Sequence, residues 1–306
     1  MRWGIVGTGP WARMVHAPSF TTHSEARLVT VWGRDPAKRE SLARESGVPA
    51  AATLDELLAS VDAVSLSVAP SAQAAIAAQV VARGRHVLLE KPVSTDVDVV
   101  RRLADGIPPG VGAMVFLTRL FEPVRARWVR ESIGCGYSQA EVTWVSAALA
   151  PGSPYADSKW RTGPGVVWDV MPHVLSQVVP VLGEVVDAEI AEWPEYDGLH
   201  AQLRHRNGGV SDVRMTLNAR PDQRVERIRF SGADGDAVSP EGPLDFVAAH
   251  RGAIQVIEAG AGIDEDPLLS MATIRSAVAT TEIMRKLAVG AGWESGQGSG
   301  DTVIGG

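Results

Sequence analysis

A glycine-rich run near the N-terminus has the residue types and spacing of a phosphate-binding turn. It reads Gly7-Thr8-Gly9-Pro10-Trp11-Ala12, follows a strand-like apolar run at 3–6 and opens a helix expected near 11–22. In this context a G-x-G-x-x-A pattern indicates a dinucleotide site rather than an ordinary turn. The first glycine permits the tight turn, the second lets a pyrophosphate approach the backbone, and the alanine lets helix and strand pack closely. Because backbone amides at the helix start favour phosphate, we predict cofactor contacts from all six residues.

A second candidate follows the apolar run at 28–32, where the chain reads Gly33-Arg34-Asp35 and then reaches Lys38. Chains that bind NAD usually place an acidic residue at this strand end to accept hydrogen bonds from the ribose 2′-hydroxyl. Arg34, with Lys38 one helical turn later, could instead bind a 2′-phosphate. Asp35 is acidic, so NAD stays an alternative cofactor. Because arginine binds phosphate through two parallel hydrogen bonds, we favour NADP over NAD.

A third candidate is Glu90-Lys91-Pro92, which ends the apolar run at 86–89. Open α/β sheets bind ligands at the carboxyl ends of their strands. Desolvation at such a place would lower the pKa of Lys91 and make its amine useful as a proton donor or acceptor. An ordinary surface lysine at a strand end is the alternative interpretation of the same residue.

A fourth candidate joins Trp160-Arg161 to Asp169 and His173 across a short Gly/Pro loop. Asp169 and His173 are four residues apart, so on a helix they share a face. A histidine beside a carboxylate can shuttle protons, and the alternative is a capping aspartate with a core histidine. We predict no metal site, because the histidines at 173, 200, 205 and 250 lack ligand spacings with acidic or cysteine partners.

The elements that must position these residues alternate over the first part of the chain. Strict alternation of near-continuous apolar strands with helices is typical of a parallel sheet covered on both faces. We therefore predict an α/β fold with a doubly wound parallel sheet. The expected strands are 3–6, 28–32, 63–68, 86–89 and 111–115, and the expected helices are near 11–22, 36–46, 53–59, 71–83 and 94–105.

After about residue 118 the pattern changes to that of an α+β domain. Asn207-Gly208-Gly209 between two strand-like runs is a strong hairpin signal, because these residues accept positive φ at low cost. Runs joined by tight turns predict a mostly antiparallel sheet. The expected strands are 139–149, 185–192, 199–206, 210–219 and 224–231, and the expected helices are near 121–132, 166–181 and 267–289.

Composition limits the function classes. The chain has 306 residues and a net charge of −7, which argues against a protein that coats nucleic acid or binds membranes through a polybasic surface. Cys135 is the single cysteine, so no internal disulfide forms and a cytoplasmic location is expected. The sequence contains no run of about 18 or more uncharged apolar residues, the length that is needed to cross a bilayer. The Gly/Ser-rich segment 290–306 predicts a flexible tail.

Taken together, these motifs resemble the Gfo/Idh/MocA oxidoreductases over nearly the whole chain. The resemblance rests on the glycine-rich turn, His16 and Pro18, the run from Gly84 to Pro92, the Trp160-Arg161 pair and the Asp169/His173 pair, in this order. It implies a Rossmann domain at 1–117 for NADP or NAD and an α+β substrate and oligomerisation domain at 118–289. It also implies a homodimer or homotetramer formed through the C-terminal open sheet.

The resemblance also implies roles for individual residues. Lys91, Asp169 and His173 would be catalytic. The cofactor would contact residues 7–12, Arg34 and Lys38, and also Ala69, Pro70, Gln73, Glu90 and Lys91. The small-molecule substrate would contact Thr118, Trp160, Arg161, Asp169 and His173.

Four positions depart from the usual family pattern: Met171 replaces a glycine, Gln73 a histidine, Thr118 an asparagine and Leu120 an arginine. The last three often face the family's pocket. We therefore expect a smaller or less polar substrate than is usual for the family.

The predicted reaction is reversible oxidation of a sugar-like or polyol-like secondary alcohol, with hydride passing to or from the nicotinamide. His173 is our first choice for the proton and Lys91 for orienting the oxygen, although their roles could be exchanged. Two alternatives stay open: a glycoside hydrolase of the same family that retains NAD, and a nucleotide-binding regulatory protein without catalysis.

Overall fold

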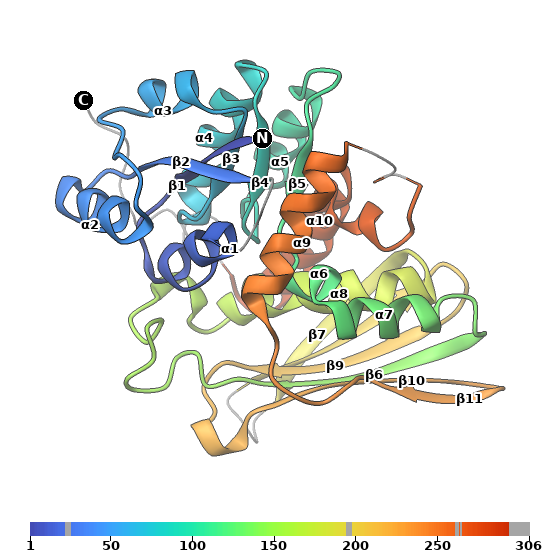
Figure 1. Cartoon of the computed structure of the whole chain (residues 1–306). Helices are drawn as coiled ribbons and strands as arrows, with labels where there is room; N and C mark the ends of the chain where they lie inside the picture. Colours follow the sequence, from blue (N-terminus) through green and yellow to red (C-terminus); the bar gives the residue numbers. More distant parts are fainter. Residues whose placement is uncertain (22–25, 194–197, 261–262, 264, 294–306) are drawn as a thin grey trace. The chain divides into compact units, whose positions relative to one another are not determined.

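The computed structural model describes residues 1–21, 26–193, 198–260, 263 and 265–293, and it divides into two compact units (Figure 1). The first comprises Met1–Pro123 and Leu244–Val278, and the second comprises Val124–Pro243 and the chain from Ala279. This division differs from the expected contiguous domains 1–117 and 118–289, because a late segment of the chain returns to the first unit.

The first unit is built on a five-stranded parallel sheet in the order β2-β1-β3-β4-β5. Each strand is followed by at least one helix in sequence, which confirms the predicted doubly wound fold. The strands are β1 (Arg2–Val6), β2 (Arg27–Trp32), β3 (Ala63–Leu66), β4 (His86–Leu89) and β5 (Ala113–Val115), and the helices that follow them include α2 (Pro36–Ser46), α3 (Leu54–Ser60), α4 (Pro70–Ala82) and α5 (Val97–Asp105).

Local capping determines where several of these helices begin. The side chain of Asp35 accepts a hydrogen bond from Lys38 N, and that of Thr53 accepts one from Glu56 N. Asp96 caps α5, so this helix begins at Val97 rather than near residue 94 as predicted. An oxygen at the cap satisfies backbone N–H groups that have no partner within the helix.

The helix expected at 11–22 is a π-helical turn, η1 (Ala12–His16), followed by α1 (Ala17–Thr21). Residues 22–25 lie outside the described part of the chain.

One helix of the first unit, α9 (Phe246–Ala259), was not predicted. It packs against η1, α1, the short helix α6 (Thr118–Phe121) and β4. Asp245 caps it, and its buried side includes His250, Ile254 and Ile257. The return of α9 to the Rossmann sheet explains why the first unit is discontinuous in sequence.

The second unit contains a six-stranded sheet in the order β11-β10-β6-β9-β8-β7. All neighbouring strands are antiparallel except β6 and β9, which are parallel, so the prediction of a mostly antiparallel sheet is confirmed. The predicted hairpin at 207–209 joins β8 to β9, and β11 was not predicted. The strands are β6 (Tyr137–Val145), β7 (Val185–Trp193), β8 (Gly198–His205), β9 (Val210–Thr216), β10 (Val225–Gly232) and β11 (Gly235–Val238).

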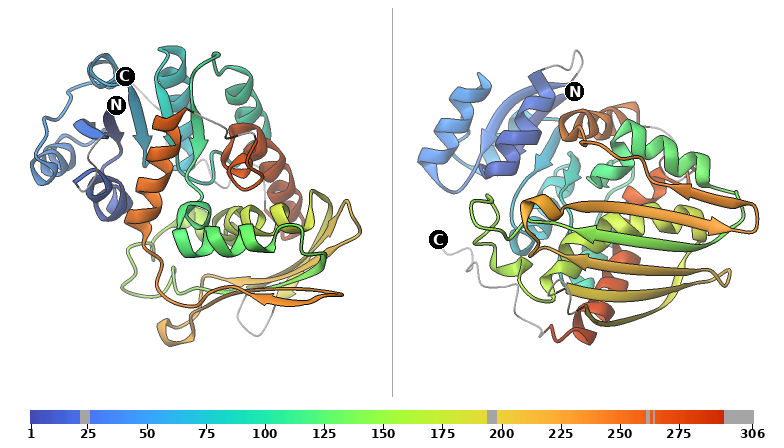
Figure 2. Two further views of the ribbon diagram at one scale, coloured as in Figure 1. Left: turned by 45° about the vertical axis from the view of Figure 1, so that its right-hand side comes forward. Right: turned by 90° about the horizontal axis from the view of Figure 1, so that it is seen from below.

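Helices cover one face of this sheet. α8 (Gly165–Leu182) contacts β6, β8 and β9, and Trp128 of α7 (Pro123–Ser132) stacks on Phe230 of β10. The opposite face carries no described helix, as the view from below in Figure 2 shows. α8 is long and apolar enough to cross a membrane, but 83% of it is buried, as expected for a core helix.

Two predicted helices are divided in the structure. Pro123 separates α6 from α7, because proline has no N–H to continue the preceding helix. The helix expected at 267–289 is a 3-10 turn, η5 (Leu269–Ala272), followed by α10 (Ile274–Gly290). Two further short turns are η2 (Lys159–Arg161) and η4 (Pro221–Gln223).

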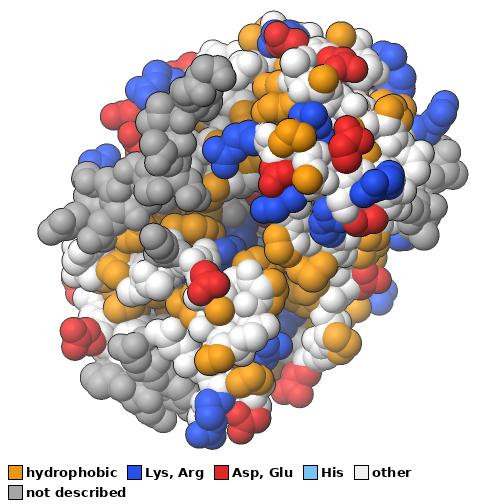
Figure 3. Space-filling model, turned by 90° about the vertical axis from the view of Figure 1, so that its left-hand side faces the viewer, with side chains coloured by type: hydrophobic (Ala, Val, Ile, Leu, Met, Phe, Trp, Pro, Cys, Tyr) orange, Lys and Arg blue, Asp and Glu red, His pale blue; other side chains and the backbone are white. Residues whose placement is uncertain are grey.

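Residues 290–293, which were expected to belong to a flexible tail, are instead part of the second unit. Gly290 ends α10, and Trp293 packs edge-on against the buried Trp168, with ring centroids 6.1 Å apart. Residues 294–306 lie outside the described part of the chain. On the molecular face drawn in Figure 3, basic and acidic side chains are interspersed.

Candidate active site

The glycine-rich turn has the shape of a phosphate cradle. Gly7 follows β1 with φ +123°, and a Cβ there would lie 2.0 Å from the carbonyl oxygen of Ser67. A Cβ at Gly9 would meet nothing within 4 Å, so this side of the turn is open. The backbone can therefore be approached closely at Gly9, as a pyrophosphate requires, and the residues present fit a dinucleotide.

The end of β2 presents a basic residue rather than a free acidic one. A Cβ at Gly33 would lie only 2.7 Å from Thr8 Cγ2, so a side chain has little room there. Asp35 Oδ1 accepts a hydrogen bond from Lys38 N at 3.1 Å, and Asp35 Oδ2 lies 3.9 Å from Lys38 Nζ. The Asp35 carboxylate therefore caps α2. Arg34 is exposed and has no hydrogen bond or ion pair with the described residues.

The backbone around Lys91 is held by a buried amide. Gln73 is fully buried, and its Nε2 donates to Glu90 O at 2.6 Å and to Pro92 O at 3.1 Å. Glu90 N in turn donates to Gln73 Oε1 at 2.8 Å. In this position Gln73 supports the turn that carries Lys91. Ala69 and Pro70 lie nearby in sequence, at the N-cap and first residue of α4.

Glu90 links this turn to the glycine-rich run. Its Oε1 accepts a hydrogen bond from Trp11 Nε1 at 2.6 Å and lies 2.9 Å from His16 Nε2. Trp11 and Glu90, both predicted cofactor residues, are thus brought together. His16 belongs to the motif order used above but was not predicted as a site residue. Its buried partners, Ser65 and His250, carry no signal in the sequence.

Thr118 lies at the start of α6, where both it and Arg119 are buried. Arg119 Nη1 donates to Thr118 Oγ1 at 2.7 Å. The hydroxyl of this predicted substrate residue therefore has a cationic neighbour from its own helix.

In the second unit, two of the predicted substrate residues, Trp160 and Asp169, lie against a third, Arg161. Arg161 Nε lies 3.3 Å from Asp169 Oδ2, and Arg161 Nη1 donates to Ser158 Oγ at 2.9 Å. The guanidinium carbon lies 4.1 Å from the ring centroid of Trp160 and 4.6 Å from that of Tyr155. The two rings and the carboxylate fix the guanidinium plane. Tyr155 and Ser158 were not predicted, because only the folded loop brings them to Arg161.

His173 lies on α8, four residues after Asp169, as predicted. It is 5% exposed, and its ring stacks on Trp144 with a centroid distance of 5.5 Å and an interplanar angle of 3°. α8 runs unbroken through Met171 and Pro172, so the departure from the family pattern preserves the spacing of Asp169 and His173. These two residues belong to the second unit and Lys91 to the first.

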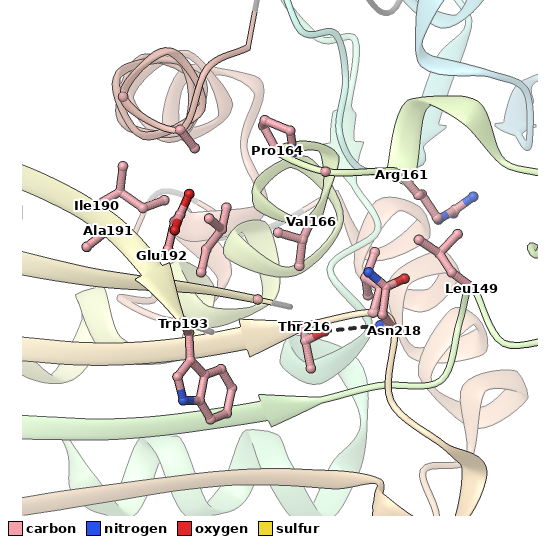
Figure 4. Close-up of a pocket in the computed structure, with 16 residues that line it drawn as sticks. Leu149, Arg161, Pro164, Val166, Ile190, Ala191, Glu192, Trp193, Thr216 and Asn218 are labelled. Carbon is pink, nitrogen blue, oxygen red and sulfur yellow. Dashed lines mark hydrogen bonds between the residues drawn. The ribbon is translucent and has the colours of Figure 1, made fainter. Parts of the chain in front are cut away.

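A cavity of about 680 Å³ opens in the second unit beside Arg161 (Figure 4). Its lining combines apolar residues with a few polar groups, including the amide of Asn218, whose backbone N donates to Thr216 Oγ1 at 3.1 Å. Such a lining suits a small ring with hydroxyl groups. The lining includes Leu149, Arg161, Val166, Glu192, Trp193, Thr216 and Asn218.

Comparison with known proteins finds a family match over the first part of the chain and a relative over most of its length. Residues 1–107 match the GFO_IDH_MocA family, described as an oxidoreductase family with an NAD-binding Rossmann fold. Inositol 2-dehydrogenase of Rhizobium meliloti (strain 1021) is 26% identical over 250 residues, which cover 76% of this chain and 74% of that protein.

Solved structures share the whole fold. A putative myo-inositol dehydrogenase from Sinorhizobium meliloti 1021 aligns with a TM-score of 0.79 at 20% identity, covering 95% of this chain and 97% of that one. GenD2 from gentamicin A biosynthesis, solved in complex with NAD, aligns with a TM-score of 0.77 at 20% identity, covering 95% and 94% of the two chains. The resemblance predicted from the motifs is thus found over residues 1–107, which match the Gfo/Idh/MocA oxidoreductases, and the chain is similar over most of its length to a protein named as a dehydrogenase.

Proposed function

We propose that the protein is an NADP-preferring dehydrogenase acting on a secondary alcohol or ketone of a sugar, polyol or similar small molecule. The bound nicotinamide cofactor supplies or accepts the hydride. The chain's own residues must orient the alcohol and move one proton to or from its oxygen.

The observation that carries this proposal is the position of Lys91. It lies two residues after the end of β4, at the carboxyl end of a strand next to β3 and β5, where open α/β sheets bind their ligands. The preceding Glu90 accepts a hydrogen bond from Trp11 of the glycine-rich turn. The segment that carries this titratable amine is thereby linked to the turn that fits a dinucleotide.

We assign the proton at the substrate oxygen to His173, with Lys91 orienting that oxygen and stabilising developing alkoxide charge. Histidine can donate and accept near neutral pH, which suits a reversible reaction. Asp169 is ion-paired with Arg161, so it supports the arrangement as a fixed carboxylate.

The test is turnover on a panel of polyols and sugars, followed at the NADPH absorbance. Lys91→Met and His173→Ala should each lower kcat by roughly 10²-fold or more. Lys286→Met is the matched control and should retain wild-type turnover. Lys286 lies on α10 and is paired with Asp187 of β7. Undiminished turnover in both site variants would refute the assignment. Glycoside cleavage without net consumption of cofactor would favour the hydrolase alternative.

NADP preference is supported by the end of β2. Gly33 lies so close to the side chain of Thr8 that a larger residue has little room there, and the Asp35 carboxylate caps α2. Arg34, between these two residues, is exposed. An arginine at this place can bind a 2′-phosphate with two hydrogen bonds, and Lys38 adds a second positive charge.

Fluorescence titration with NADPH and NADH tests the preference. Arg34→Ala should weaken NADPH binding by roughly tenfold or more, corresponding to a charge-assisted hydrogen bond, and leave NADH binding unchanged. Arg44→Ala, at an exposed position on the last turn of α2, is the matched control. Equal affinity of the unaltered protein for both cofactors would refute NADP preference.

We further propose that the substrate is an uncharged ring compound. Asp169 already neutralises Arg161, and apolar residues such as Leu149 and Val166 line the neighbouring cavity together with Thr216 and Asn218. A hydroxylated ring offers one apolar face and several hydroxyl groups to such a lining. The name of the inositol dehydrogenase relative agrees with this class.

We propose that the protein is cytoplasmic, in keeping with its single, free Cys135, and that it self-associates through the uncovered face of the second-unit sheet. That face carries ion pairs, among them Arg229 with Glu141 at 3.7 Å and Arg214 with Asp212 at 3.3 Å. A contact of this polar character should weaken as salt rises. Light scattering at low and high ionic strength tests it, and a monomer under both conditions would refute the proposed assembly.

A further inference from the structure

Five polar side chains form a continuous chain of contacts inside the first unit. Glu90 Oε1 lies 2.9 Å from His16 Nε2, and His16 Nδ1 lies 2.8 Å from Ser65 Oγ. Ser65 Oγ lies 3.0 Å from His250 Nε2, and His250 Nδ1 lies 2.6 Å from Ser19 Oγ. His16, Ser65, His250 and Ser19 are all fully buried. The chain joins the residue before Lys91 to η1, β3 and α9.

The hydrogen positions can be worked out from the Ser19 end. Ser19 Oγ donates its single hydrogen to the carbonyl oxygen of His16 at 2.7 Å. His250 Nδ1 must therefore carry a hydrogen and donate it to Ser19 Oγ. Burial, and next the charge of the neighbouring His16, lower the pKa of His250 well below its ordinary value, so this ring is neutral. A neutral ring with a protonated Nδ1 has a bare Nε2 that accepts.

The same reasoning assigns the donors and acceptors at Ser65 and His16. Ser65 Oγ must donate to the bare His250 Nε2, so it can only accept from His16 Nδ1. His16 Nδ1 is therefore protonated. The remaining nitrogen, His16 Nε2, faces Glu90 Oε1, and two lone pairs at 2.9 Å would repel each other. One further proton must lie between His16 and Glu90.

The other contacts of Glu90 decide which partner carries that proton. Trp11 Nε1 donates to Glu90 Oε1 at 2.6 Å, and Lys91 N donates to Glu90 Oε2 at 3.3 Å. Both are N–H donors, which suit a carboxylate. The pair is thus a His16 imidazolium beside a Glu90 carboxylate. The rings of His16 and His250 are 4.2 Å apart, so only one of them can carry a charge.

We propose that His16 is a positioning residue for Lys91: donating from both ring nitrogens, it compensates the carboxylate of Glu90, the residue before Lys91, while the Ser65–His250–Ser19 chain fixes the hydrogen on His16 Nδ1. The inference deepens the proposed function, since it concerns the lysine that the proposed reaction uses. Removing only the histidine leaves an uncompensated carboxylate beside Lys91, and this favours the ammonium form of the lysine.

Other charged groups lie on the elements packed around the pair. Arg13 of η1 is paired with Glu45, and Glu258 of α9 is paired with the N-terminal ammonium. The remaining ones are Lys91 after β4, His86 at the start of β4, Arg251 on α9, Asp245 at its N-cap, and Arg119 with Glu122 at α6.

A spectroscopic experiment tests the proton arrangement without reference to activity. The ¹⁵N shifts of the imidazole nitrogens of the intact protein would be recorded at the pH of the activity measurements. Both nitrogens of His16 should carry a hydrogen, and His250 should have a protonated Nδ1 and a bare Nε2. A bare nitrogen on His16 would overturn the proposal.

The pH dependence of kcat/KM tests the consequence for Lys91. One limb of the pH profile of kcat/KM should disappear in Lys91→Met, which assigns that limb to Lys91. In His16→Asn the same limb should move to higher pH by roughly half a unit or more, because a neighbouring negative charge favours the ammonium form of the lysine. Glu90→Gln and the double variant should keep the limb at its wild-type position, even where they lower the rate. His200→Asn removes another histidine paired with a carboxylate, Asp212, and serves as the matched control.

If the Lys91 limb of the kcat/KM profile lies at the same pH in His16→Asn and in the wild-type protein, the positioning role is overturned. If His16→Asn fails to fold, the ¹⁵N experiment on the unaltered protein still decides the proton arrangement. If Lys91→Met turns over normally, the proposed function fails, whereas the ¹⁵N result stands or falls by itself. The two failures are therefore distinguishable.

Discussion

The imidazole of His173 lies flat against the indole of Trp144, with the two planes only 3° apart and the ring centroids 5.5 Å apart. His173 comes from the middle of α8 and Trp144 from the end of β6. Because a stacked ring can rotate only by leaving its partner, the strand fixes the plane of the proposed proton-handling group.

Replacing Trp144 with leucine should therefore misorient His173. We expect kcat to fall by about 10-fold to 10²-fold with a smaller change in KM, since small misplacements of a catalytic group carry costs of this size. Trp144→Phe keeps an aromatic surface and should retain most of the activity. Steady-state kinetics check the prediction, and equal losses in the two variants would contradict a role for stacking.

The two glycines of the dinucleotide turn should respond differently to alanine. Gly7→Ala places a Cβ against Ser67 O at a positive φ, so we expect a loss of unfolding free energy of roughly 1–3 kcal/mol. Gly9→Ala meets no atom within 4 Å and should keep its stability while losing affinity for NADPH. Urea denaturation and fluorescence titration of both variants separate the two effects. Unchanged cofactor binding in Gly9→Ala would argue against pyrophosphate at this turn.

Arg161 offers a test of planar stacking. In Arg161→Lys the positive charge remains, but the flat group between Trp160 and Tyr155 is lost. Asp169 would then have a looser partner, and we expect kcat/KM to fall by about tenfold, the equivalent of one charge-assisted hydrogen bond. The unfolding free energy should change little. A lysine variant with wild-type kcat/KM would show that charge alone suffices.

The surface pair Arg2–Asp62 predicts a pH dependence of stability. Hydrogen bonds from the Arg2 side chain, and then from its backbone N, lower the pKa of Asp62 to about 2. A lowered carboxyl pKa stabilises the fold above the ordinary aspartate range of about 4, and this stabilisation is lost as pH falls through about 2. The Arg2 and Asp62 side chains are 52% and 37% exposed, so we expect a contribution of no more than about 1 kcal/mol.

Urea denaturation of the wild-type protein and of Asp62→Asn checks this prediction. The difference in unfolding free energy between them should shrink as pH falls from about 5 toward about 2. A difference that does not change with pH would mean that the ion pair contributes nothing.

Elements with strong local signals were predictable. α2 spans residues 36–46 as expected, because Asp35 caps its start, Pro36 fits the first turn, and Gly47 ends it at φ +67°. The apolar runs of the parallel strands were also recognisable, since strands buried on both faces carry almost no polar residues. The hairpin at 207–209 was read from its turn residues alone.

α9 was missed although it has local signals: Asp245 caps its start and Gly260 ends it at φ +64°. Other features had no local signal. The pairing of Arg161 with Asp169 joins residues eight apart across a loop, so its existence depends on how η2 meets the start of α8. The stacking of His173 on Trp144 likewise depends on α8 packing on β6.

The sequence by itself determined the alternation of strands and helices, the glycine-rich turn and the order of the chemically active residues. These follow from side-chain periodicity and from backbone preferences within a few residues. Only the tertiary structure decided that Arg34 stays exposed, and that Gln73 holds the turn carrying Lys91. It alone showed that Glu90, His16, Ser65, His250 and Ser19 form one buried chain. These contacts join residues up to 231 positions apart, and such distances are set by how elements pack rather than by local preference.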